Sequence, residues 1–300
     1  MNVIKKYIWL LQKLQQYGEL TQKDFDRLWQ NSNLSYGKPL DSRNFHRWKD
    51  AAEDLFSVDI ECVCSQGQYR YRIKRNSNDE VTNWLLHTMT VSNLLEEYKG
   101  QNDSIILEKV PSGESHLGTI LDAIKYGKQL MVTYHNFHRE EANPPALVNP
   151  LCVKLSDRRW YVLVDFAEKE NYRRIMALDR IVHIELQPTS YTMPENFDAK
   201  TYFNDSYGIT VMSDVPTETV VLKVPASAAP YLRALPFHPS QRETRKEGDF
   251  VFMEYLLKIT DELAFALLRH AVRSEIVEPA SLREKVKELA RQIIDKHNNQ

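Results

Sequence analysis

Residues 130–134 read Leu-Met-Val-Thr-Tyr, and residues 159–164 read Arg-Trp-Tyr-Val-Leu-Val. Both stretches are rich in β-branched and aromatic residues, which is typical of β-strands. Together with similar segments they make a series of about five short predicted strands, at residues 130–137, 147–155, 159–166, 175–181 and 182–187. Short strands in close succession are typical of a small barrel. The sequence therefore predicts a β-barrel over residues 129–190.

Basic and aromatic side chains gather in this predicted barrel. Strand alternation sends Trp160 to one face and Arg159 and Tyr161 to the other. The same segment also carries Lys154, His138, Arg139, Arg158, Arg173, Arg174 and Arg180. Arginines beside aromatic rings suit a polyanion with groups that stack, such as a nucleotide or an oligonucleotide. The alternative interpretation is that Trp160 belongs to the core and that the arginines form a solvated rim.

The N-terminal residues 1–76 predict a winged helix-turn-helix. Apolar residues recur at helical spacing over residues 3–14, and Gly18 follows as a stop. Thr21 with Asp24 has the spacing of a capping box for a second helix, and Asp41 or Ser42 begins a third. The third helix has a predicted apolar face formed by Phe45, Trp48, Ala52, Leu55 and Phe56. Two predicted strands at residues 58–63 and 68–73 then enclose a turn at residues 65–67.

The third helix and the hairpin carry the predicted DNA contacts. Arg43 and Arg47 lie opposite the apolar face, where an arginine pair one turn apart suits a reader of the major groove. The full set of candidates is Ser42, Arg43, Asn44, His46, Arg47, Arg70, Arg72 and Lys74. The alternative is that Arg43 and Arg47 only solvate an exposed helix face, which the nearby Asp50, Glu53 and Asp54 favour.

The remaining segments complete a predicted α+β chain. Residues 77–128 predict a helical linker, with a helix from Val81 to near Gly100, a short strand at 105–110 and a helix around 117–127. Residues 191–215 predict a connector with a helix around 197–207. Residues 216–300 mix strands and helices and predict a compact C-terminal α+β domain.

Four motifs of the predicted barrel resemble, in order and spacing, the signatures of WYL-domain regulators. They are Leu130–Tyr134, Val148–Leu151, Arg159–Leu163 and Ala177–Ile181. This chain has Trp-Tyr-Val where the family name expects Trp-Tyr-Leu, a small apolar change. The resemblance covers nearly the whole chain, because a predicted winged helix-turn-helix precedes the motifs and a segment similar to the family's C-terminal extension domain follows them at residues 216–300. The resemblance implies that this extension domain serves dimerisation.

The resemblance implies a bacterial transcription factor that commonly dimerises and senses single-stranded nucleic acid or nucleotides through an Sm/SH3-like barrel. Combined with the charge pattern, it implies a ligand site formed by Tyr134, His138, Arg139, Lys154, Arg159, Trp160, Tyr161, Arg173, Arg174 and Arg180. Many family members carry an arginine shortly before the proline at position 150, and this chain has none there. Arg139 or Lys154 is the candidate substitute.

Other classes of function find little support in the sequence. The net charge is −2, and no apolar run approaches the roughly 20 residues that span a bilayer. The three cysteines form no disulfide framework, so we expect a cytoplasmic protein. No phosphate-binding glycine loop or metal-ligand spacing occurs, and we therefore expect no cofactor and no enzymatic activity.

The leading hypothesis is a homodimeric transcriptional regulator that binds a double-stranded DNA operator and responds to a single-stranded nucleic acid or nucleotide effector. The runner-up is a nucleic-acid-binding accessory protein that acts through the barrel without promoter specificity. An inert structural adaptor is the third possibility.

Overall fold

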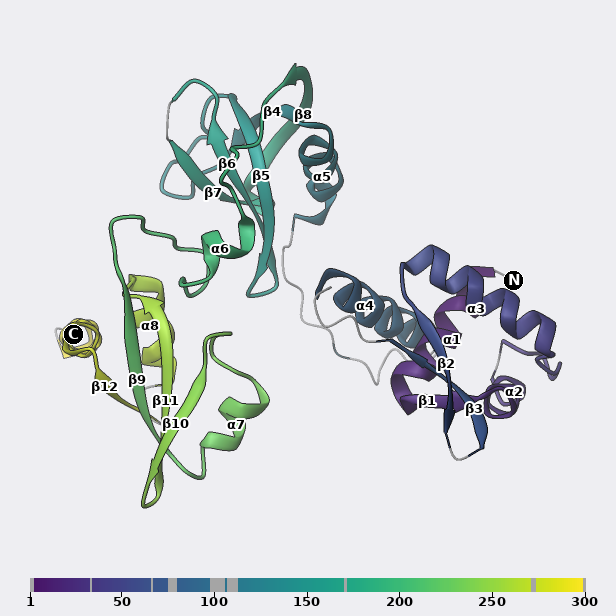
Figure 1. The fold of residues 1–300 in the computed structure, drawn as a ribbon. Helices are drawn as coiled ribbons and strands as arrows, with labels where there is room; N and C mark the ends of the chain where they lie inside the picture. Colours follow the sequence, from purple (N-terminus) through teal and green to yellow (C-terminus); the bar gives the residue numbers. More distant parts are fainter. Residues whose placement is uncertain are drawn as a thin grey trace. The chain divides into compact units, whose positions relative to one another are not determined.

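The computed structural model describes residues 3–32, 34–65, 67–74, 80–97, 106, 113–169, 172–270 and 274–298. The chain divides into two compact units, Met1–Glu108 and Lys109–Gln300, and each is described by itself (Figure 1). Of the described helices, none combines the length and the apolar character that crossing a membrane requires.

The first unit contains the predicted three helices and hairpin. The helices are α1 (Val3–Tyr17), α2 (Gln22–Gln30) and α3 (Ser42–Phe56), and the hairpin strands are β2 (Ile60–Ser65) and β3 (Gln68–Ile73). The structure adds a short strand that the sequence analysis missed, β1 (Glu19–Thr21), which pairs with β3. The antiparallel sheet has the order β1-β3-β2. A further helix, α4 (Glu80–Glu97), packs against α1.

Local signals in the sequence fix the ends of these helices. Thr21 and Asp24 form the predicted capping box at the start of α2, with the Asp24 backbone N–H donating to the Thr21 hydroxyl. Of the two predicted caps for α3, the structure has Asp41, whose carboxylate accepts the backbone N–H of Asn44 at 2.8 Å. Gly18 ends α1 with φ +77°, a conformation that glycine adopts without steric cost.

Aromatic rings form the core of the first unit. Trp29 meets Trp9 edge to face at 5.0 Å between ring centroids and meets Trp48 at 4.8 Å, while Phe25 lies 5.0 Å from Phe45. The predicted apolar face of α3 is wrong at Leu55, whose side chain is exposed. Leu55 lies in the last turn of α3, beyond Ala52, the last fully buried residue of that helix.

The second unit begins with a five-stranded antiparallel sheet. Its strands are β4 (Lys128–Tyr134), β5 (Ala146–Ser156), β6 (Arg159–Phe166), β7 (Arg173–Ala177) and β8 (Ile181–Ser190), in the order β7-β6-β5-β4-β8. Five predicted strands are thus present, but the predicted closed barrel is not shown. Among the described residues β7 and β8 are the two edges of an open sheet, joined by a 3₁₀ turn at residues 178–180.

One face of this sheet is covered by α5 (Leu117–Tyr126), and the core between them contains Ile120, Leu130, Val148 and Val162. The sequence analysis assigned α5 to the linker, whereas the helix packs on β4, β5 and β8. The predicted helix end near Gly100 and the predicted strand at residues 105–110 lie outside the described residues, apart from Ile106, which is in no strand. In the connector the helix is shorter than predicted, α6 (Ala199–Phe203).

A second antiparallel sheet follows, with the order β10-β11-β9-β12. Its strands are β9 (Thr217–Pro225), β10 (Arg242–Glu247), β11 (Phe250–Lys258) and β12 (Glu275–Glu278), and its helices are α7 (Ala229–Ala234), α8 (Asp261–His270) and α9 (Ala280–Asn298). Buried residues of α8 and α9 share one core with β9 and β11. The sequence analysis missed β12.

Candidate functional site

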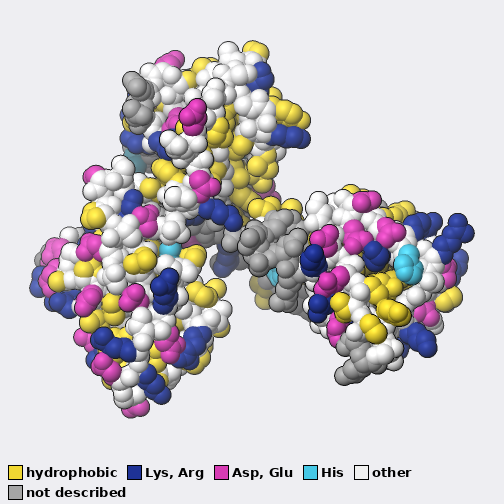
Figure 2. All heavy atoms as spheres, viewed as in Figure 1, with side chains coloured by type: hydrophobic (Ala, Val, Ile, Leu, Met, Phe, Trp, Pro, Cys, Tyr) yellow, Lys and Arg dark blue, Asp and Glu magenta, His cyan; other side chains and the backbone are white. Residues whose placement is uncertain are grey.

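The predicted DNA-contacting face of α3 is exposed. Arg43, His46 and Arg47 lie at the surface, while Phe45 and Trp48 point into the core. The Arg43 guanidinium has no hydrogen-bond or ion-pair partner among the described residues. Figure 2 shows that basic and acidic side chains are interspersed on the visible face of this unit.

Asn44 is engaged at the start of α3. Its side-chain amide donates to the Asp41 carboxylate at 2.6 Å, and its carbonyl accepts from Arg47 at 2.7 Å. The hydrogen bonds from Asn44 also hold the pKa of Asp41 below its ordinary value, the backbone N–H more strongly than the side chain. The chain of contacts Asp41–Asn44–Arg47 orients Arg47 along the helix surface.

His46 connects α3 to the hairpin. One ring nitrogen, Nδ1, lies 2.8 Å from the Ser42 carbonyl, and the other, Nε2, lies 3.3 Å from the Tyr71 hydroxyl. The ring also meets Phe45 edge to face at 5.3 Å. His46 therefore helps to hold the helix on the sheet. Ser42, another predicted contact residue, is exposed beside it.

The hairpin arginines are paired with acidic side chains. Arg72 donates to Glu61 at 2.6 Å and stands opposite Glu19 in the β1–β3 register. Arg70 lies 3.8 Å from the Glu19 carboxylate. Of the predicted basic residues of the hairpin, only Lys74 is exposed with no side-chain partner among the described residues.

On the five-stranded sheet the structure brings together four predicted ligand-site residues, Tyr134, Arg159, Tyr161 and Arg180, with Asp179. We call these five residues the Arg159 cluster. Arg159 pairs with Asp179, and this hydrogen bond raises the pKa of the Arg159 guanidinium. Burial raises the pKa of Tyr161, on which the charges of Arg159, Asp179 and Arg180 also act.

The Arg159 cluster holds buried polar atoms without partners among the described residues. They are Nε of Arg159, Nε of Arg180 and Oδ1 of Asp179. The Arg180 guanidinium lies 4.3 Å from the centre of the Phe137 ring, and the Tyr134 hydroxyl accepts the backbone N–H of Ala177 at 3.3 Å. Buried polar groups that lack partners are uncommon, and they mark places where a further hydrogen-bonding group fits.

Other predicted ligand-site residues lie apart from the Arg159 cluster. Trp160 is half-buried and packs against the core beneath α5. His138 and Arg139 are exposed in the segment after β4, where Arg139 donates to Asn143 at 3.3 Å. Arg174 is exposed at the edge strand and lies 4.0 Å from the centre of the Tyr172 ring.

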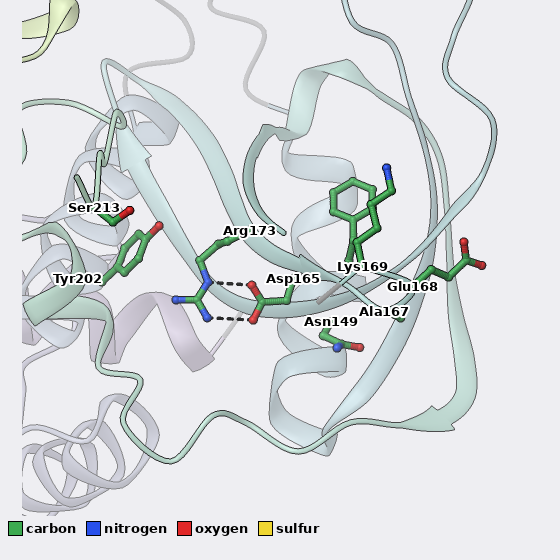
Figure 3. A pocket seen from close by; sticks show the side chains of 9 residues that line it. Asn149, Asp165, Ala167, Glu168, Lys169, Arg173, Tyr202 and Ser213 are labelled. Atoms are coloured by element: carbon green, nitrogen blue, oxygen red, sulfur yellow. Dashed lines mark hydrogen bonds and ion pairs between the residues drawn. The ribbon is translucent and has the colours of Figure 1, made fainter. Parts of the chain in front are cut away.

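Arg173 lies beside a cavity of about 600 Å³. Its guanidinium donates twice to Asp165, at 2.8 and 2.9 Å, and these bonds raise the pKa of Arg173. Figure 3 shows Arg173 between Asp165 and the side chains of Tyr202 and Ser213. The guanidinium also lies 5.4 Å from the Tyr202 ring and 5.3 Å from the Phe197 ring. Arg173 thus joins the sheet edge to the connector.

Lys154 also contacts the connector. Its ammonium group donates to the Gly208 carbonyl at 2.5 Å and lies 4.1 Å from the Phe203 ring. Burial lowers the pKa of Lys154, and the nearby Glu262 opposes this effect. Glu262, at the start of α8, accepts the backbone N–H groups of Ile209 at 3.0 Å and Thr210 at 2.8 Å.

The sequence analysis missed several acidic and aromatic residues that lie beside Arg159, Arg173 and Lys154. These residues are Asp165, Asp179, Tyr202 and Glu262. Only Asp165 and Asp179 had a usable signal, because each lies in or next to a predicted strand whose basic residues were already singled out. No group of three or more potential metal ligands occurs in the part of the chain that the structure describes.

This arrangement defines an α+β protein with ion pairs and aromatic rings gathered on one antiparallel sheet. Residues 115–186, which contain α5 and most of that sheet, match the sequence profile of the WYL domain. Residues 216–294 match the profile of the WCX domain. The chain therefore contains a WYL domain followed by a WCX domain.

Among solved structures, the chain is similar to proteasome accessory factor B/C (PafBC) of Arthrobacter aurescens, with 16% identity and a TM-score of 0.35 over 95% of this chain and 46% of that chain. It is also similar to a CRISPR Cas-related protein, with 11% identity and a TM-score of 0.40 over 87% of this chain and 75% of that chain. The chain thus spans less than half the length of PafBC. A comparison with curated proteins gives no match.

Proposed function

We propose that this chain is a homodimeric, cytoplasmic bacterial transcriptional regulator that binds duplex DNA through α3 and responds to an effector at its WYL domain. One observation carries the proposal. The WYL domain shares a chain with a unit of three helices and a hairpin in which α3 presents Arg43 and Arg47 to solvent. That order of elements is typical of a winged helix-turn-helix. The proposal contains no catalytic step and no cofactor.

The effector in this proposal is an anion of nucleic-acid type, either a short single strand or a nucleotide. The Arg159 cluster supports it with two guanidinium groups, two tyrosines and one carboxylate on the five-stranded sheet and the turn that follows β7. Guanidinium groups bind phosphate through paired hydrogen bonds, and aromatic rings stack on bases. Such an anion changes the affinity for DNA only to the extent that it binds one conformation of the regulator more tightly than the other.

A gel-shift titration tests the DNA-binding part. The probe is the DNA upstream of the protein's own gene, with a mixed-sequence duplex for comparison. We expect the Arg43→Ala/Arg47→Ala variant to bind at least about tenfold more weakly, because a good arginine–guanine contact contributes roughly 1–3 kcal/mol. The variant Lys287→Ala/Arg291→Ala removes the same charge from α9 and is the matched control.

The effector part is tested by adding a short oligothymidylate or a nucleotide to the same titration. We expect a change in DNA affinity that Arg180→Met abolishes, because methionine keeps an unbranched side chain beside Phe137 and removes the guanidinium charge. An oligonucleotide that alters DNA binding equally in both proteins would contradict an effector site at the Arg159 cluster.

A specific observation favours a second candidate, a nucleic-acid-binding accessory protein without promoter specificity. Arg72 is paired with Glu61, and Asn44 is engaged by Asp41 and Arg47, so few groups of the first unit are free to read bases. In that case Arg43→Ala/Arg47→Ala leaves duplex binding unchanged, and Arg174→Ala/Arg180→Ala abolishes the binding of all nucleic acids.

A further inference from the structure

The loop between α2 and α3 contains a turn of unusual composition. The Ser35 carbonyl accepts the backbone N–H of Lys38 at 3.0 Å, and the two central residues, Tyr36 and Gly37, have φ values of +51° and +76°. Two central residues with positive φ define a type I′ turn, in which asparagine, aspartate and glycine are the preferred residues. A bulky aromatic residue is disfavoured at Tyr36, because its Cβ crowds the backbone in the left-handed region.

The fold gains no packing from the Tyr36 side chain. The residue is 80% exposed, and its ring and hydroxyl have no partner among the described residues. Steric cost without burial is typical of residues that act at a surface. The tyrosine is therefore better explained by a contact outside the chain than by the stability of the turn.

The turn is held firmly in place. Ser35 is buried. Its hydroxyl donates to the Ser32 carbonyl at 2.9 Å and accepts the backbone N–H of Gly37 at 3.0 Å. On the other side, Leu40 is buried and its N–H donates to Asp26 at 2.7 Å. These anchors fix the orientation in which Tyr36 is presented.

The turn also lies close to the proposed DNA contacts. Tyr36 is five residues before Asp41, the cap of α3, and an extended chain of five residues spans at most about 18 Å. The exposed Lys38 lies between them. When a helix enters the major groove, the segments just before it come near the sugar–phosphate backbone that borders the groove.

We propose that Tyr36 contacts the DNA backbone beside the groove entered by α3, with its hydroxyl donating to a phosphate and its ring against the deoxyribose. This inference rests on the proposed DNA-binding function and adds a contact that reads no sequence. Because tyrosine is uncharged, the contact displaces no counterion, and it differs in this respect from a lysine or arginine bound to a phosphate.

The test uses the full chain and a short mixed-sequence duplex, titrated at several salt concentrations. We expect Tyr36→Gly to weaken binding by about tenfold, the value of one hydrogen bond to a charged group. The slope of log affinity against log salt stays the same, because an uncharged side chain neutralises no phosphate. Because glycine suits the turn, the melting temperature of Tyr36→Gly is equal to or above that of the wild type.

The matched control is Ser57→Gly. Ser57 ends α3 with φ +52° and is also exposed, so this change relieves the same kind of strain at the other end of the helix. We expect its DNA affinity to equal that of the wild type. Tyr36→Phe separates the two parts of the contact and retains only the contribution of the ring.

Equal binding by Tyr36→Gly, Ser57→Gly and the wild type would overturn the inference while leaving the proposed function intact. A steep loss of salt dependence in Tyr36→Gly would also overturn it, because an uncharged contact has no such effect. Failure of the wild type to bind any duplex at low salt would instead overturn the proposed function.

Discussion

At the scale of single residues, Gly208 lies where the connector meets α8. Its φ is +67°, and a Cβ at this position would overlap the Glu262 carboxylate. We therefore expect Gly208→Ala to displace Glu262 from the N–H groups of Ile209 and Thr210. Alanine is strained in the left-handed backbone conformation of position 208, and the hydrogen bonds of Glu262 are lost as well. We therefore expect the free energy of unfolding, measured with urea, to fall by roughly 2–4 kcal/mol.

Gly248→Ala is the control for this change. Gly248 has a similar φ of +55°, but a Cβ added there would have no other atom within 4 Å. We expect only the backbone cost, about 1 kcal/mol. Equal losses in the two variants would show that Glu262 contributes nothing to the folding of the connector.

The buried His238 is expected to make the stability of the second unit depend on pH. Burial lowers the pKa of its imidazole, Lys154 lowers it further, and Asp205 opposes both. The unfolded chain, with a pKa of about 6.5, thus binds the proton more readily than the folded chain. The stability from neutral His238 is complete above about pH 6.5 and is lost as the pH falls toward the lower folded value. We expect His238→Gln to flatten this slope in denaturant titrations, with the exposed His183→Gln as control.

The identity of the basic residues could be read from the sequence, but their partners could not. Arg159 and Arg180 were predicted for the ligand site, and the structure places them together. Asn44 and Arg72 were predicted to face DNA, and the structure shows them engaged by Asp41 and Glu61. Such pairings depend on strand register and rotamers, which the residue pattern of a single strand or helix does not contain.

At the scale of elements, the ion pair on the hairpin leads us to expect a substitution that strengthens DNA binding, whereas the arginine substitutions above weaken it. Glu61→Gln removes the charge that holds Arg72 and keeps the shape of the side chain. We expect tighter duplex binding, by about threefold at low salt, and a salt slope steeper by up to about 0.9 as Arg72 becomes free for a phosphate. Stability changes by less than about 1 kcal/mol, because the pair is at the surface.

Asp214→Asn is the control for the change in net charge, because it adds the same charge in the second unit. Equal gains in affinity for both variants would mean that overall charge, and not Arg72, attracts the duplex. No gain in either variant would mean that the hairpin stays away from the DNA.

Helices and long strands were predictable because their periodicity extends over many residues. The capping box at Thr21 and the stop at Gly18 also located the ends of α1 and α2. The strands β1 and β12 were missed because three or four residues are too few to establish an alternation. That the five-stranded sheet is open among the described residues could not be predicted, because the residue pattern of a single strand does not say whether two edge strands pair.

At the scale of the whole molecule, the first unit offers few side chains for reading bases. Arg43 and Arg47 are the exposed arginines of α3, and Asn44 is engaged within the helix. Each arginine–base contact contributes roughly 1–3 kcal/mol. Specific DNA binding is stronger than non-specific binding by roughly 4–10 kcal/mol, and two such contacts supply at most the lower part of that difference. Under the proposed function, promoter specificity therefore requires two copies of α3 on one operator.

This requirement predicts a symmetric footprint. Two α3 helices that enter successive major grooves on one side of the duplex are about 34 Å apart, or a multiple of that distance. Hydroxyl-radical footprinting on the upstream DNA is therefore expected to show two protected patches related by an inverted repeat. Arg43→Ala/Arg47→Ala should lose both patches together, and base changes in one half-site should weaken protection of the other. A single protected patch would contradict the dimeric regulator and favour the accessory protein, since one α3 lacks the contacts to select a promoter.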